Sequence, residues 1–255
     1  MTEDLQDKEI AEALEKGHDL LQKGNYREAL LQFEKASTQD PIRQEGVQGL
    51  QMAGVTLRLM HWLAGAAVYL SEALKQVDSI DDARLKAAIH RDQGAVFYEQ
   101  SLVYRKQHPD AISPYTPLAD NAFMTSLVLL YEELKKDLSE EEYGRIEAEI
   151  AVTKGFRGML FFDMRVRYDY AEARWARQLV EQADSDLRAL GDDFQVYQLN
   201  NLIRLMRVSY LVDRFSYLDR ALTLTNRTSD SPGSRKRVYA AMFGNRIYRL
   251  LSKHG

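Results

Sequence analysis

One spacing of small and large residues occurs twice in the first third of the chain, and it limits the possible folds more than any other feature. The first set is Gly17, Leu20, Ala29, Phe33 and Ala36, and the second, 37 residues further on, is Gly54, Leu57, Ala66, Leu70 and Ala73. A glycine inside a helix costs up to ~1 kcal/mol relative to alanine, so we interpret these glycines as places where two helices cross closely. A repeat of this length predicts helix pairs that bury their apolar faces against neighbouring pairs.

Helices are also predicted for the rest of the chain. The whole chain of 255 residues has only five prolines, three of them between Pro109 and Pro117. No segment alternates with the period of a strand. Gly24-Asn25 is expected to be a turn, whereas Asp78–Asp82 and Ser139 are expected to cap helices. We therefore predict an all-α fold. We call the two helices of each pair its first and second helix, and we expect the first helix of a third pair at Gly94 and its second helix near Ala122.

Three spans are too long to be single helices in a domain of this size. Residues 139–189 would extend about 75 Å at 1.5 Å per residue, so we expect the chain to turn back within residues 161–173. By the same reasoning, residues 44–77 should bend near 61–65, and residues 194–226 near 208–213.

The first repeat resembles the tetratricopeptide repeat family. The matching positions are Gly17, the turn Gly24-Asn25-Tyr26, Ala29, Phe33, Ala36 and Pro41, whereas Lys16 stands where the family usually has a large apolar residue. The resemblance implies an α-solenoid of stacked antiparallel helix pairs forming a right-handed superhelix. It would occupy residues 1–226, with the best repeats at 10–41 and 47–78 and degenerate ones at 82–136, 139–189 and 193–226. Residues 234–255 would form a basic amphipathic capping helix.

The same resemblance implies a function and a site. Family members usually bind a peptide or helix of a partner protein in the concave groove that the first helices line, so we expect a non-catalytic interaction scaffold or adaptor. The inward positions carried over from the family are Leu14, His18, Gln22, Gln51, Val55, Arg58, Arg91, Ala95, Tyr98 and Glu99. Some members clamp a terminal carboxylate with Lys and Asn, where this chain has Leu14 and His18, and this argues against that class of partner.

The charge distribution suggests an alternative function. From Arg227 onward there are seven Lys/Arg and one acid, which gives +6, whereas the chain as a whole carries −4. The residues of this candidate basic surface are Arg235, Lys236, Arg237, Arg246, Arg249 and Lys253. They could bind nucleic acid or an acidic partner, or they could be the solvated face of a capping helix.

Residues 157–178 combine arginines with aromatic rings. Such a mixture suits nucleic-acid recognition, because arginine pairs with phosphate and aromatic rings stack on bases. It equally suits packing of arginine stems over rings. Acids such as Asp163, Asp169 and Glu172 offset the charge, so we favour packing.

No motif for catalysis or cofactor binding is apparent. The chain has no cysteine, which excludes disulfides and thiol chemistry, and no phosphate-binding loop or nucleophile elbow is found. Glu15 and His18 have the spacing of a di-iron ligand pair, but a second pair is missing. The N-terminus does not read as a signal peptide, and the apolar window Met52–Leu74 contains charged residues. We expect a cytoplasmic protein that is not an enzyme, has no metal or cofactor, and does not enter membranes.

Overall fold

The computed structural model describes residues 3–39, 43–109, 111–165, 170–191, 194–208, 217–218 and 220–225. These residues form helices and turns and include no strand, which confirms the all-α prediction. The helices are α1 (Glu3–Gln22), α2 (Tyr26–Gln39), α3 (Gln44–Leu59), α4 (Leu63–Val77), α5 (Ala83–Gln107), α6 (Tyr115–Glu133), α7 (Glu140–Arg165), α8 (Tyr170–Ala189) and α9 (Gln195–Val208). Residues 220–225 are also helical. The predicted repeat-closing Pro41 and capping helix 234–255 lie outside the described residues.

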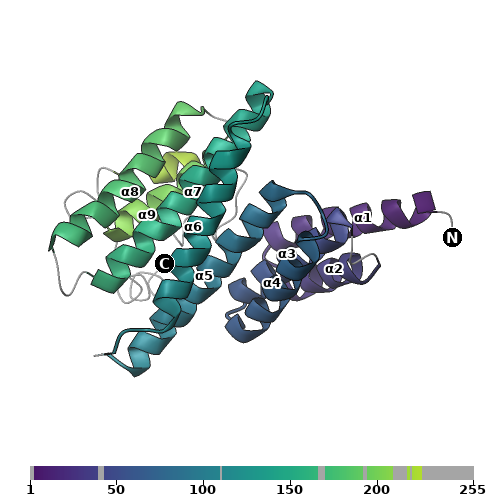
Figure 1. Cartoon of the computed structure of the whole chain (residues 1–255), viewed down its shortest axis with the longest axis horizontal. Coiled ribbons are helices and arrows are strands. Elements are labelled where there is room, and N and C mark those ends of the chain that lie inside the picture. The colour runs from purple at the N-terminus through teal and green to yellow at the C-terminus, as the bar shows by residue number, and fades with distance from the viewer. Residues whose placement is uncertain are drawn as a thin grey trace, which may run out of the picture. The chain divides into compact units, whose positions relative to one another are not determined.

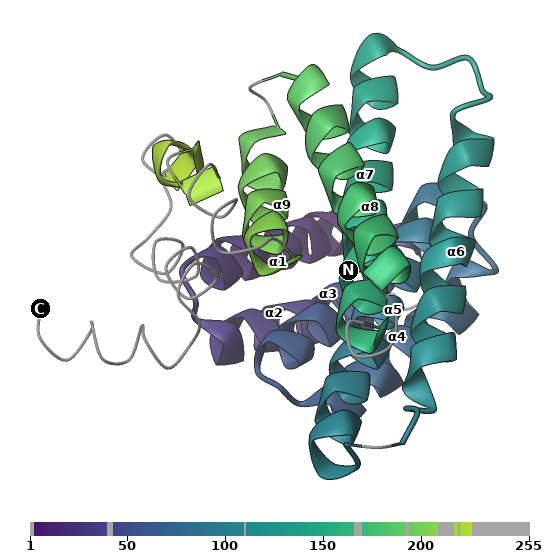
Figure 2. The same cartoon turned by 90° about the vertical axis from the view of Figure 1, so that its left-hand side faces the viewer.

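The chain divides into two units, residues 1–135 and 136–255. In the first unit each helix from α1 to α6 packs against the next one in the chain (Figures 1 and 2). The first helices of successive pairs also meet, because α1 contacts α3 and α3 contacts α5. The core of this unit therefore forms from neighbouring helices, as expected for repeated pairs.

Three glycines lie where the two helices of a pair cross. A Cβ placed on Gly17 would lie 2.6 Å from the Phe33 ring, and one on Gly54 would lie 2.7 Å from Cγ of Leu70. On α5, a Cβ at Gly94 would lie 2.6 Å from the ring of Phe123 on α6. The second helix of the third pair is therefore α6, and its contact residue Phe123 is next to Ala122, where this helix was predicted. These contacts confirm that the glycines allow close packing.

The turns after α1 and α3 have the same backbone design. The amides of Gly24 and Asn25 donate to the carbonyls of Leu21 and Leu20, closing the first helix with the paired hydrogen bonds of a Schellman motif. The amides of His61 and Trp62 repeat this pattern with Arg58 and Leu57. The residue after the helix has positive φ in both turns, 77° at Gly24 and 61° at His61. The predicted bend near residues 61–65 therefore falls at 60–62, with a non-glycine residue in the left-handed position.

The two turns predict opposite changes in the free energy of unfolding when their left-handed residues are substituted. His61→Gly should raise the free energy of unfolding by about 1 kcal/mol, because a left-handed residue with a Cβ is strained by roughly that amount. Gly24→Ala should lower it by a similar ~1 kcal/mol through the same strain, since a Cβ at Gly24 would meet no atom within 4 Å. Urea unfolding of the two variants measures both effects, and a loss of stability in His61→Gly would contradict the backbone explanation.

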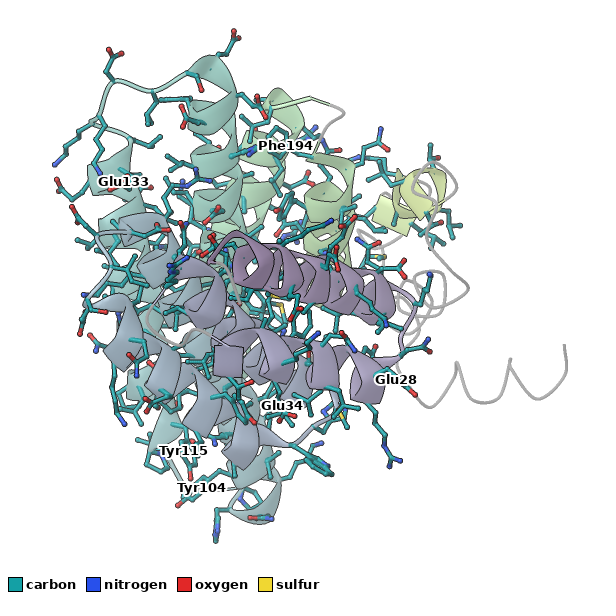
Figure 3. All side chains as sticks on the ribbon, turned by 90° about the vertical axis from the view of Figure 1, so that its right-hand side faces the viewer. Glu28, Glu34, Tyr104, Tyr115, Glu133 and Phe194 are labelled. Carbon is teal, nitrogen blue, oxygen red and sulfur yellow. The ribbon has the colours of Figure 1, made fainter. Side chains whose placement is uncertain are left out.

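The other predicted boundaries follow from local hydrogen bonds. Asp82 caps α5 by accepting a hydrogen bond from the Leu85 amide at 2.8 Å. Ser139 and Glu142 form a capping box at the start of α7, because each side chain accepts a hydrogen bond from the other residue's backbone amide. Where α5 ends and α6 begins, Tyr104 and Tyr115 lie edge to face with ring centroids 6.4 Å apart (Figure 3). They hold together the ends of the proline-containing connection.

The second unit contains α7, α8 and α9, each of which contacts the other two. The chain turns back between Arg165 of α7 and Tyr170 of α8, inside the predicted range 161–173. The third predicted bend, at 208–213, falls beyond Val208 and so outside the described residues. A Cβ on Gly158 would lie 2.6 Å from Val180 of α8, and one on Gly155 would lie 2.6 Å from Oδ1 of Asn201 of α9. These two glycines of α7 thus allow both α8 and α9 to pack closely against it.

Candidate partner-binding surface

The residues predicted to line the groove lie on α1, α3 and α5, the three first helices that contact one another. We call the surface that carries them the first-helix face; its members are Leu14, His18, Gln22, Gln51, Val55, Arg58, Arg91, Ala95, Tyr98 and Glu99. Each of the three helices carries the glycine of the repeated Gly-large spacing and is the first helix of its pair. Which of the predicted residues share one accessible face stays a prediction.

On α1 the face is partly apolar. Leu14 is buried, Gln22 is exposed, and His18 is half-buried with its ring edge to face against Phe33 at 5.3 Å between centroids. Burial lowers the pKa of His18 below its usual value, so this imidazole is neutral at pH 7. His18 is better described as a ring that packs on the helix crossing than as a charged contact.

Between α3 and α5 the face is joined by polar bonds. Gln51 Nε2 donates to Asp92 Oδ2 at 2.8 Å, and this pair is buried. Arg58 Nη1 donates to Glu99 Oε1 at 2.7 Å, about two helical turns further along α3. In both pairs the acid lies 41 residues after its partner in the chain. These bonds link successive first helices and neutralise much of the charge of the face.

Several predicted contact residues are therefore less accessible than the groove hypothesis suggests. Gln51 and Tyr98 are each 6% exposed, and the Arg91 Nε lies 3.5 Å from Asp92 Oδ1. Val55, Arg58 and Glu99 are half-buried. Sequence reasoning missed Asp92 because it follows the inward position Arg91 by one residue. Both pairs are 41 residues apart, one more than the 40 residues that separate Gly54 from Gly94, and this offset is the signal that could have indicated Asp92.

The buried Gln51–Asp92 bond leads to a second prediction. Asp92→Ala should lower the free energy of unfolding by about 1–3 kcal/mol, because the Gln51 amide would lose its acceptor while remaining buried. The double variant Gln51→Leu/Asp92→Leu should regain part of this loss, since neither partner would then be left unsatisfied. Urea unfolding compares the three proteins, and equal stability of wild type and Asp92→Ala would contradict this role.

The second helices are linked in a similar way. The Tyr69 hydroxyl on α4 donates a hydrogen bond to Oε1 of Glu34 on α2. Burial, followed by the interaction with Glu34, raises the pKa of Tyr69 to about 12. Successive pairs are thus joined by polar contacts on both the first and second helices, and these contacts fix how neighbouring pairs stack.

The arginine-aromatic segment in the second unit has an internal structural role. The Arg157 guanidinium lies over the rings of Phe161 and Trp175, at 5.1 and 5.7 Å from their centroids. The two rings meet edge to face at 4.8 Å. This geometry agrees with the packing interpretation for Arg157, because its cationic group is engaged by the rings of its own unit.

Other predicted features are located as follows. The candidate basic residues Arg235, Lys236, Arg237, Arg246, Arg249 and Lys253 lie outside the described residues. Glu15 is exposed on α1 near His18. Within the described ranges, no group of three or more His, Asp or Glu is placed to hold a metal ion, and no helix has the length and apolar character needed to cross a membrane.

Comparison of the sequence with models of protein families gave no match, and comparison with curated proteins gave none either. The class of protein is therefore defined by the structure alone. The described part of the chain is all-helical, and within each unit the helices pack neighbour to neighbour.

Proposed function

We propose that this protein is a non-catalytic adaptor that binds a peptide or helix of a partner protein on the first-helix face. The observation that supports the proposal is the contact of α1 with α3 and of α3 with α5, which brings the first helices of three successive pairs side by side. The resemblance to tetratricopeptide repeats supports the same function and, with it, a solenoid that curves around its ligand. The absence of cysteine is compatible with a cytoplasmic setting, which we propose as well.

The chemistry of the face supports binding of an extended or helical segment. Its side chains combine an exposed amide at Gln22, apolar surface at Val55 and a neutralised ion pair at Arg58–Glu99. Mixed surfaces of this kind are typical of protein interfaces, in which a few central residues carry most of the binding free energy.

Selection of random displayed peptides on the purified full chain tests this function. We expect specific peptides to be enriched and to lose affinity for the variant Gln22→Ala/Val55→Ser. The control variant is Leu31→Ser/Val68→Ser, which changes exposed apolar residues of the second helices α2 and α4. Enrichment of no peptide, or equal loss of binding in both variants, would contradict the proposal.

Nucleic-acid binding through the basic C-terminal region is the second candidate, supported by the +6 charge of residues 227–255. Fluorescence anisotropy with short RNA and DNA at two salt concentrations tests it, because each phosphate contact releases counterions and makes the affinity salt-dependent. Binding that weakens steeply with salt would favour this function. No binding at low salt would eliminate it.

A further inference from the structure

The turn between α3 and α4 exposes two large apolar side chains next to the first-helix face. Trp62 is 62% exposed and Leu59 is 38% exposed. Tryptophan buries more surface than most residues when a partner covers it, and it is enriched among the residues that dominate binding. The position of Trp62 at a turn leaves its side chain accessible without any rearrangement of the helices.

The backbone of this turn is strained. His61 has positive φ in the place that glycine occupies in the preceding repeat. Its side chain is largely exposed, with Nδ1 3.8 Å from Glu99 Oε2, so packing does not account for a histidine here. Residues held in strained conformations at a surface are often found at functional sites.

Helix α5 adds a second edge to this surface. The Arg58–Glu99 bond fixes α5 beside the turn. Val103 and Lys106 follow Glu99 on the same side of α5, since residues four and seven positions apart lie on one helical face. Val103 is 45% exposed, and Lys106 is exposed as well. We call Leu59, His61, Trp62, Val103 and Lys106 the turn patch.

The charge at the turn patch differs from that of the unit around it. Residues 1–135 contain 21 Asp/Glu and 14 Lys/Arg, a net charge of −7. Near the turn patch, however, the chain has Arg105 and Lys106, and the next acid after Glu99 is Asp110, which lies outside the described residues. The carboxylate of Glu99 already accepts a hydrogen bond from Arg58. Complementary charge directs the choice of partner, so an acidic segment is favoured at this end of α5.

We propose that the turn patch binds an acidic peptide segment of a partner protein, with an aromatic or aliphatic side chain of the peptide packing against Trp62 and its carboxylates facing Lys106. This inference rests on the proposed adaptor function and names the chemistry of the ligand. The half-buried residues of the first-helix face then help to align the peptide, whereas the turn patch supplies the anchor.

The experiment uses peptides enriched by display on the full chain, together with copies in which each Asp and Glu is replaced by Asn and Gln. Fluorescence anisotropy measures their affinity for wild type, Trp62→Ala, Lys106→Glu and the control Val68→Ala, whose residue is exposed on α4. We expect Trp62→Ala to weaken binding about tenfold or more, as for anchor residues of other interfaces. Lys106→Glu and the amide peptides should both bind several-fold more weakly, and Val68→Ala should bind as wild type does.

The outcomes separate the two proposals. Enriched peptides that bind Trp62→Ala and Lys106→Glu as tightly as wild type would overturn the turn patch and leave the adaptor function standing. Enrichment of no peptide would overturn both. Competition by single-stranded DNA for the same patch, lost in Trp62→Ala, would indicate a nucleic-acid ligand instead of an acidic peptide. Thermal melts confirm that each variant is folded.

Discussion

Replacing Gly17 by leucine is expected to lower the free energy of unfolding by about 3 kcal/mol, the upper part of the range for overpacked sites. A Cβ at this position would already lie 2.6 Å from the Phe33 ring, and Phe33 is itself fully buried, so the ring has little room to move. Leucine adds three more carbon atoms to this contact. Helices α1 and α2 would have to separate to accommodate it.

A matched glycine distinguishes this crossing effect from helix propensity. A Cβ placed on Gly65 of α4 would have its nearest contact, with Leu57, at an ordinary 3.4 Å. Gly65→Ala should therefore be neutral or stabilising by up to ~1 kcal/mol, as expected for alanine in a helix, whereas Gly17→Ala should be destabilising. Urea unfolding measures all three variants. Equal stability of Gly17→Leu and wild type would show that α1 and α2 do not cross there.

Replacing Phe123 by alanine is expected to lower the free energy of unfolding by about 3–5 kcal/mol, the range for buried phenylalanines. Phe123 is fully buried, and its ring lies against the helix backbone at Gly94. Loss of the ring would leave a cavity between α5 and α6. That cavity cannot be filled from the α5 side, because glycine has no side chain.

Met124 provides the control for this prediction. It is the next residue of α6 and is partly exposed, so Met124→Ala should change the free energy of unfolding by less than about 1 kcal/mol, as for most surface substitutions. If Phe123→Ala were no more destabilising than Met124→Ala, the α5–α6 crossing would not contribute as described.

The architecture could be predicted from the sequence where side-chain size and backbone breaks determine it. Small residues at Gly17, Gly54 and Gly94 indicated the crossings, because only glycine admits a ring or a leucine at that distance. The partner of Gly94 could be placed only approximately, since the long connection before α6 interrupts the repeat spacing. The break after Arg165 was predicted from length alone, with no strong breaker to mark it.

The candidate site was harder to predict. The resemblance gave the residues of one face, but the exposure of Gln51 or Tyr98 depends on how closely neighbouring first helices pack. The Gln51–Asp92 and Arg58–Glu99 bonds depend on the rotation of α5 relative to α3. A rotation of α5 about its axis by the angle between adjacent residues would bring a different side chain toward α3. An alignment of repeats does not specify this rotation.

The turn patch was not predicted because it depends on backbone conformation. The sequence showed Gly24 as a turn residue, whereas histidine at the equivalent position has no obvious turn preference. The positive φ of His61 and the paired backbone hydrogen bonds after α3 show that both repeats close in the same way. The exposure of Trp62 follows from that turn, since it places the residue outside both α3 and α4.

Hydrogen exchange of the full chain, with and without a peptide enriched by display, tests the central claim most directly. If the protein is an adaptor that uses its first helices, bound peptide should slow amide exchange in the turn after α3 and in the second half of α5. Exchange in α7 and α8 should be unchanged. Protection confined to α7–α9 or to residues 227–255, with none in α3 or α5, would contradict the account.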